Sequence, residues 1–256
     1  MKHSNKTLPS FRANYRAIAL ISSLLLLGQA HSHAHHVWIE QDAKGAKLYF
    51  GEFGDNLREA SPGLLDRFAK PSAQKVSSKG SETLITTKTA NGFALAGLAV
   101  KGESLVAEDA AYPITDSKDG DKTFRRLYVP AARLVADGSK QEAKLVLDLV
   151  PTGKQDTDGM EVQAIYKGKP LAKAKVEVIT AFGWSKELRA DEDGKLTFKM
   201  PWKGSYVLEL KHADGAGERG TEKYDRANYV TSLTVMQAVG MAPLATPALA
   251  TPNTMK

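Results

Sequence analysis

Four of the six histidines in this chain fall within one short stretch, HSHAHH, at residues 31–36. They are His31, His33, His35 and His36. An α-amine beside an imidazole is a strong chelator of Cu(II), Ni(II) and Zn(II), so a cleavage that leaves one of these histidines at or beside a new N-terminus would create a metal site. The stretch therefore predicts metal binding that depends on processing of the chain.

The segment before the histidines is typical of a cleaved secretion signal. Its first part holds four cations and no acid, and residues 17–28 (AIALISSLLLLG) form an apolar core that is too short to span a bilayer well. Small residues at the −3 and −1 positions allow cleavage after Ala30 or after Ala34. Neither site is followed by a cysteine, which argues against a lipoprotein anchor. We expect residues 1–34 to be a signal peptide and the mature chain to be periplasmic, without a membrane segment of its own.

The two cleavage sites would produce different chelates. The earlier one places His33 third in the chain, where an amine, two backbone amides and an imidazole can surround a square-planar Cu(II) or Ni(II) ion. The later one makes His35 the first residue, which binds through its amine and Nδ1 and leaves positions for His36, for His212 or for a carboxylate. Candidate oxygen ligands, or acceptors that orient an imidazole, are Glu40, Glu52 and Asp214.

The composition restricts the class of protein. The chain has no cysteine, so an exported form has neither a disulfide nor a thiolate ligand. The formal net charge of +6 includes the four cations of the N-terminal segment and falls to +2 without them, so we expect no nucleic-acid partner. Signatures such as G-x-S-x-G and H-E-x-x-H are absent, and we expect no enzymatic activity.

Short alternating apolar stretches follow the histidines, separated by Gly, Pro, Asp and Asn, which is the pattern of antiparallel β-sandwiches. The first two strands are predicted at residues 37–40 and 47–53, joined by a turn at 42–45, and a solvated turn is predicted at 114–122. We expect an all-β protein of two Ig-like β-sandwich domains. The predicted divisions are a signal peptide at 1–34, an N-terminal β-sandwich at 35–150, a linker at 151–159, a C-terminal Ig-like domain at 160–236 and a disordered tail at 237–256.

Several stretches of the chain resemble a known family. They are AHHVWIE at 34–40, GE at 51–52, GKPLAKAKVEV at 168–178, ADEDGKLTFKMPWKGSYVLELKH at 190–212 and YVTSLTV at 229–235. Together they are similar to a DUF-type periplasmic family of NikM-like and NikK-like nickel-transport components, whose mature chains typically begin with Ala-His-Asp-Phe-Trp-Leu-Glu. His35, Trp38 and Glu40 stand at matching positions, whereas His36 replaces the acidic residue and Val37 the aromatic one. The later stretches are shared by many Ig-like and prealbumin-like modules, so only the histidine segment relates to nickel.

The resemblance implies a periplasmic protein that binds Ni(II) or Co(II) and serves as an accessory component of a membrane transporter for metal uptake. Two alternatives stay open, namely a periplasmic carrier of Cu(II) and an Ig-like interaction module that binds no metal. Copper oxygenases that attack polysaccharides also begin with a histidine on a β-sandwich, and here only His36 or His212 could complete such a site. Of these possibilities, the resemblance favours the nickel or cobalt protein.

Overall fold

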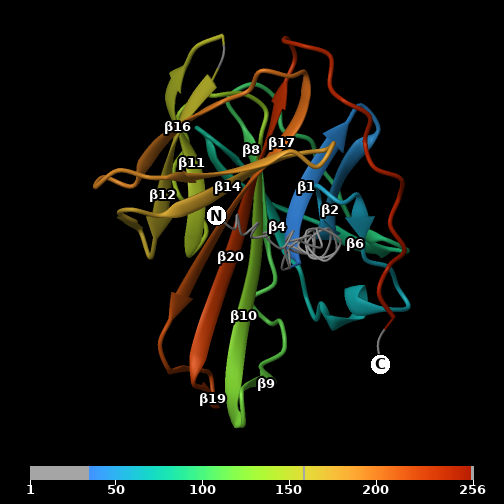
Figure 1. The fold of residues 1–256 in the computed structure, drawn as a ribbon, viewed down its shortest axis with the longest axis vertical. Helices are drawn as coiled ribbons and strands as arrows, with labels where there is room; N and C mark the ends of the chain where they lie inside the picture. The colour runs from blue at the N-terminus through green and yellow to red at the C-terminus, as the bar shows by residue number, and fades with distance from the viewer. Residues whose placement is uncertain (1–34, 158, 255–256) are drawn as a thin grey trace, which may run out of the picture. The chain divides into compact units, whose positions relative to one another are not determined.

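The computed structural model describes residues 35–157 and 159–254, so the predicted signal peptide, with His31 and His33, lies outside the described residues. The described chain is all-β, as predicted, and its only helix is a short 3-10 helix, η1 (Leu64–Arg67) (Figure 1). In this part of the chain no helix has the length and apolar character needed to cross a bilayer.

The largest sheet has nine strands and forms the middle layer. Its strands follow the order β15-β14-β17-β20-β10-β8-β4-β5, with β9 paired to β10. They are β4 (Ser72–Ser77), β5 (Gly80–Leu84), β8 (Ser104–Glu108), β9 (Thr115–Asp119), β10 (Lys122–Val135), β14 (Lys175–Thr180), β15 (Ser185–Arg189), β17 (Gly204–Asp214) and β20 (Arg226–Gln237). Neighbours are antiparallel except β10 and β20, which run parallel. Both halves of the sequence contribute strands, so the two predicted domains share this sheet.

Two smaller sheets cover opposite faces of the middle sheet. Because side chains alternate along a strand, Val207 of β17 lies in a buried cluster with Trp38, whereas its neighbour Leu208 lies in a cluster with Phe198. One outer sheet contains β1 (His36–Asp42), β2 (Gly45–Glu52), β3 (Leu57–Arg58), β6 (Thr86–Thr89) and β7 (Gly92–Leu95). The other contains β11 (Leu147–Gln155), β12 (Gly159–Tyr166), β13 (Lys169–Pro170) and β16 (Lys195–Lys199). A separate pair is formed by β18 (Gly217–Arg219) and β19 (Glu222–Tyr224).

Two segments that were expected to be loops are strands. Residues 151–155 of the expected linker belong to β11 and pair with β12 in an irregular register. Among the described strands β11 pairs with β12 alone, and a sheet edge tolerates Pro151 because one side of such a strand needs no N–H donor. Residues 115–119 of the expected turn form β9, whose mostly exposed polar side chains gave the segment its loop-like composition.

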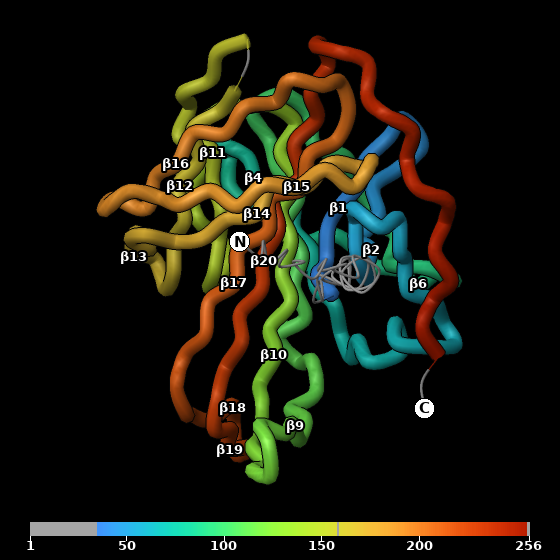
Figure 2. The backbone as a smooth tube through the Cα atoms, in the orientation of Figure 1, coloured from blue at the N-terminus to red at the C-terminus, as the bar shows by residue number. Residues whose placement is uncertain are grey.

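The C-terminal tail, expected to be disordered, is extended and attached to the β1-β2 sheet. Residues 238–254 contain no strand or helix, but an isolated bridge joins Met241 to Trp202. Further on, the Asn56 side chain donates to the carbonyl oxygen of Pro247 over 2.9 Å, and the carbonyl oxygen of Asn56 accepts from the amide of Ala250 over 3.2 Å. Figure 2 shows this segment, in red, running past β1, β2 and β6.

Candidate metal centre

The hairpin of β1 and β2 brings the first described residue, His35, to Glu52. His36 pairs with Gly51 across the two strands, so the residue before His36 comes beside the residue after Gly51. The carbonyl oxygen of His35 accepts a hydrogen bond from the Tyr128 hydroxyl over 3.0 Å, which ties this end of β1 to β10 of the middle sheet. The His35 side chain remains 25% exposed, so its ring lies at the rim of the layers and not in the core.

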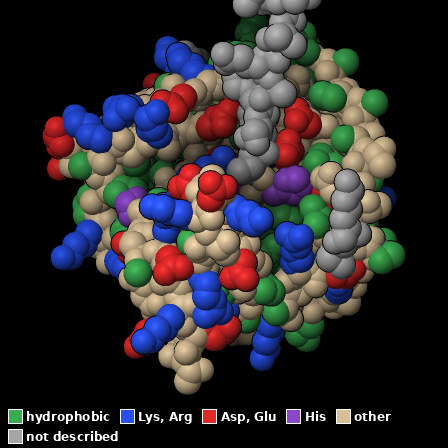
Figure 3. All heavy atoms as spheres, turned by 60° about the horizontal axis from the view of Figure 1, so that its bottom comes forward, with side chains coloured by type: hydrophobic (Ala, Val, Ile, Leu, Met, Phe, Trp, Pro, Cys, Tyr) green, Lys and Arg blue, Asp and Glu red, His purple; other side chains and the backbone are tan. Residues whose placement is uncertain are grey.

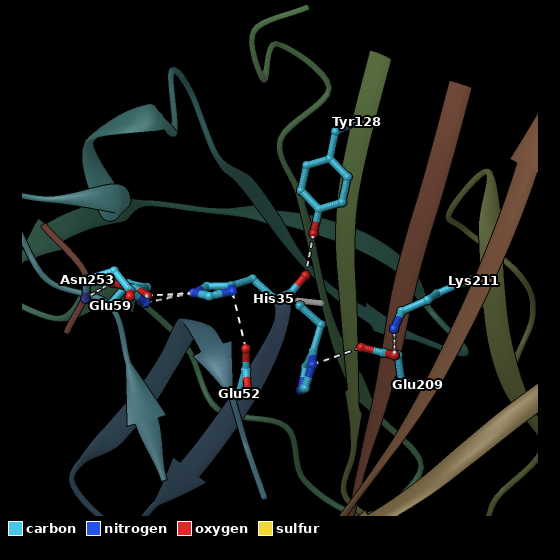
Figure 4. A network of polar contacts seen from close by, with 8 residues as sticks. His35, Glu52, Glu59, Tyr128, Glu209, Lys211 and Asn253 are labelled. Carbon is cyan, nitrogen blue, oxygen red and sulfur yellow. Dashed lines mark hydrogen bonds and ion pairs between the residues drawn. The ribbon is translucent and has the colours of Figure 1, made fainter. Parts of the chain in front are cut away.

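The His35 ring lies between two carboxylates (Figure 4). Its Nε2 is 2.5 Å from Oε1 of Glu59, whose side chain is fully buried, and its Nδ1 is 3.4 Å from Oε1 of Glu52. Glu59 also accepts two hydrogen bonds from Asn253 of the tail, one from the backbone amide to Oε2 over 2.9 Å and one from Nδ2 to Oε1 over 2.6 Å. These donors offset the cost of burying the Glu59 charge, since a buried carboxylate is stable only when it is paired and hydrogen-bonded.

Glu59 determines which ring nitrogen of His35 is available for other chemistry. A carboxylate without a proton can only accept, so Nε2 donates to it, and the neutral ring then carries its lone pair on Nδ1. Metal-bound histidines commonly donate their second ring N–H to a carboxylate in this way, which fixes the ring and strengthens the ligand. Glu59 therefore has the position of an orienting acceptor, and Nδ1 has the position of a ligand atom.

The spacing of Nδ1 and Glu52 fits a shared ion. Two ligand atoms about 2.0–2.2 Å from one ion, separated by angles of roughly 90–110°, lie about 2.8–3.6 Å apart. The observed separation is 3.4 Å. Burial and the neighbouring carboxyl of Asp55 raise the pKa of Glu52, against the opposing effect of His35. A cation at this point would relieve that unfavourable burial of negative charge.

Side chains alone do not complete the site. Among the described residues, no group of three or more His, Asp or Glu side chains is arranged to hold a metal ion. Nδ1 of His35 and Oε1 of Glu52 supply two ligand atoms. A third would come from the α-amine of His35 if the chain were cleaved after Ala34, because that amine belongs to the same residue as Nδ1.

His36 is directed to the other side of β1, because successive residues of a strand point to opposite faces. It is buried, and its Nδ1 lies 2.8 Å from Oε2 of Glu209 on β17, while Oε1 of Glu209 is 2.5 Å from Nζ of Lys211. Burial raises the pKa of Glu209, but its contacts with His36 and Lys211 outweigh this effect and hold the pKa below its usual value. His36 is therefore part of a buried charge network and does not converge on His35.

Comparison with models of known protein families identifies the family of this chain. The model of a family described as a domain of unknown function, DUF4198, matches residues 32–214, which is more than half of the sequence. The chain belongs to the DUF4198 family. The matched range includes the His35 segment and both outer sheets, and it ends at the last residue of β17. No curated protein matches the sequence of this DUF4198 protein.

The other predicted ligands of the DUF4198 protein have separate partners. The ring of His212 packs against Tyr166 with 4.2 Å between the centroids, and no hydrogen bond, ion pair or ring contact joins it to His35 in the described part of the chain. Glu40 accepts from the Trp38 ring nitrogen over 2.8 Å and pairs with Arg58. Asp214 accepts from the Tyr166 hydroxyl and from Lys167, over 2.5 and 2.8 Å. Of the three predicted oxygen ligands, only Glu52 lies at His35.

Two residues of this centre, Glu59 and Asn253, were not predicted from the sequence. Glu59 directly follows β3 at the start of an irregular segment, EASP, and nothing in the local pattern shows that this acid is buried. Asn253 lies in the tail, whose repeated Ala, Thr and Pro indicate disorder. Both residues are recognised only through their contacts with each other and with His35, which the fold creates.

Proposed function

We propose that this DUF4198 protein is a periplasmic metal-binding protein, an accessory component of a membrane transporter that takes up Ni(II) or Co(II). Its metal ion would bind at the processed N-terminus, through the α-amine and Nδ1 of His35 and Oε1 of Glu52. One observation carries the proposal: Glu59 holds Nε2 of His35 while Nδ1 lies 3.4 Å from the Glu52 carboxylate. In this proposal the ion is cargo, and His35 supplies two of its three protein ligand atoms.

The ligand set suits late divalent transition metals. Imidazole and amine nitrogens bind Ni(II), Co(II) and Cu(II), and a carboxylate adds a hard oxygen. Intrinsic affinity rises from Co(II) through Ni(II) to Cu(II), so geometry and metal supply would decide which ion is carried. The resemblance to nickel-transport components favours Ni(II) and Co(II), and a copper carrier is the second candidate. The 25% exposure of His35 would allow the ion to be passed to a partner.

The first experiment is native mass spectrometry of protein secreted with its own signal. We expect a chain that begins at His35 and retains one Ni(II), Co(II) or Cu(II) ion. His35→Ala and Glu52→Gln should each weaken Ni(II) binding at least tenfold. His212→Gln is the matched control, because His212 contacts Tyr166 and should leave binding unchanged.

A second preparation tests the α-amine directly. The same secreted chain with its N-terminal α-amine acetylated has an amide in place of the amine and should bind Ni(II) at least tenfold more weakly. A secreted chain that begins after His36, or Ni(II) binding that survives both His35→Ala and acetylation of the α-amine, would contradict the proposed site. A protein that binds none of the three ions would leave the Ig-like interaction module as the function.

A further inference from the structure

A second feature of the molecule is a cavity of about 420 Å³ on the face of the middle sheet that meets the β1-β2 sheet. Its floor comes from β10, β17 and β20, because the pairing of these strands sets Tyr128 beside Asn228 and Asn228 beside Ala213. Its wall is apolar and includes Phe50, Leu64 and Tyr112. His35 lines the rim, so the cavity opens next to the candidate metal centre.

The acidic and basic side chains that line this cavity are all of one kind, namely basic. Its lining includes Arg67, Arg126 and Lys211, and it includes no Asp or Glu. Figure 3, which turns the ends of β9 and β10 toward the viewer, shows Lys and Arg side chains interspersed with Asp and Glu on the outer surface of this face, so the single sign of charge is a property of the cavity lining. Lys211 is paired with Glu209, but within the described residues neither arginine has a carboxylate within salt-bridge distance. Such a concave cationic surface raises the local concentration of anions.

Arg126 carries the clearest sign of a missing partner. Its Nε is buried and has no hydrogen-bond partner among the described residues. A buried donor without a partner costs about 1–3 kcal/mol, and more when it is charged. The Nε and one terminal nitrogen of a guanidinium form a planar pair of donors that matches the two oxygens of a carboxylate. A carboxylate in this cavity would therefore pair with the positive charge, and it would also satisfy Nε, which neighbouring atoms cover, once the guanidinium turns toward the cavity.

We propose that this cavity binds a small organic carboxylate, with its carboxylate on Arg126 and its apolar part against Phe50, Leu64 and Tyr112. The volume lies in the range of about 300–1,000 Å³ that is typical of small-molecule sites. The combination of an apolar wall with a cationic end excludes a bare inorganic anion as the best ligand. The proposal stands on the cavity alone and does not require a metal ion at His35.

A larger groove, of about 700 Å³, does not support a comparable argument. Its lining mixes Glu40 and Asp42 with Lys44 and Lys47, so the carboxylates and ammonium groups balance each other. Its lining contains none of the buried polar atoms that lack a partner in the described chain, apart from the hydroxyl of Thr234. A hydroxyl selects no class of charged ligand.

The test compares acids with their neutral amides on the metal-free protein in EDTA, which separates this site from the metal centre. The probes are benzoate with benzamide and hexanoate with hexanamide, measured by calorimetry and by protein-observed NMR. We expect at least one acid to bind ten times more tightly than its amide, with shifts at residues of the cavity. Inorganic phosphate should bind more weakly than that acid.

The variants locate the charge that selects the ligand. Arg126→Gln should weaken binding of the acid at least tenfold, and Arg67→Gln, at an exposed position, should weaken it without affecting the fold. Arg125→Gln is the matched control, because Arg125 directly precedes Arg126 in β10 and pairs with Glu222 instead. Equal binding of acids and amides, tighter binding of phosphate, no binding of either acid, or binding unchanged in both Arg126→Gln and Arg67→Gln would overturn the proposal.

Discussion

Replacement of Glu59 by glutamine tests whether this buried carboxylate orients the candidate ligand or merely fastens the tail. Oε1 of Glu59 accepts from His35 and from Asn253 Nδ2, and Oε2 accepts from the Asn253 amide over 2.9 Å. A glutamine presents one carbonyl oxygen, so its NH₂ group would face one of these donors and a hydrogen bond would be lost. A buried polar group left without a partner costs about 1–3 kcal/mol.

The expected result of Glu59→Gln has two parts. For a chain of this size, a loss of about 1–3 kcal/mol lowers Tm by about 2–12 °C, which thermal unfolding of the metal-free protein would detect. Removal of a carboxylate that orients a metal-bound histidine weakens metal binding by about 10–100-fold, which corresponds to about 1.4–2.8 kcal/mol in calorimetry with Ni(II).

The matched control is Glu161→Gln. Glu161 is a half-buried carboxylate that accepts from Thr152 and Lys154 on the opposite outer sheet, so its replacement should leave Ni(II) affinity unchanged. If Glu59→Gln lowered Tm but left Ni(II) affinity intact, Glu59 would only fasten the tail and our reasoning about the Nδ1 tautomer would fail. If it changed neither quantity, the buried hydrogen bonds themselves would be in doubt.

Three further predictions concern stability. Asp148→Asn should lower the free energy of unfolding by about 3–5 kcal/mol, because it leaves the guanidinium of Arg133 buried without its counter-ion. Urea titrations measure this loss, and a value below about 1 kcal/mol would contradict the prediction. Asn253→Ala should speed hydrogen exchange of residues 247–253 and cost about 1 kcal/mol, and unchanged exchange would show that the tail is held by other contacts. Hydrogen bonds from Lys88 and Ser61 lower the pKa of Asp66 from 3.8 to about 2, so its contribution is present at neutral pH and is lost as pH falls from 3.8 towards 2. Thermal unfolding of Asp66→Asn should therefore depend less on pH in this window, and parallel curves for the two proteins would refute that assignment.

The sequence predicted those elements whose partners are close in the chain. The turn at 42–45 fixes the register of β1 and β2, so Glu52 could be expected beside His35 from the two strands alone. The all-β class follows similarly from local alternation of apolar residues. These predictions needed no knowledge of distant contacts.

Features that depend on contacts between residues far apart in the chain could not be predicted from the sequence. The parallel pairing of β10 with β20 joins residues about a hundred positions apart and merges the two expected domains into one sheet. The sequence of neither strand identifies the other as its partner. The burial of Glu59 depends on the tail, which lies 194 positions further along the chain. Periodicity shows which face of a strand is apolar, and it does not show what covers that face.

The attachment of the tail affects how this protein can be handled in the laboratory. Asn253, which is bonded to Glu59, lies three residues before the last residue of the sequence, and three extended residues reach at most about 11 Å. An oligohistidine tag fused to Lys256 would therefore begin within reach of His35 and could supply imidazoles to an ion at the candidate centre. Apparent metal affinities from such a fusion would measure the tag as well as the protein, so a cleavable tag or a tag-free preparation is required.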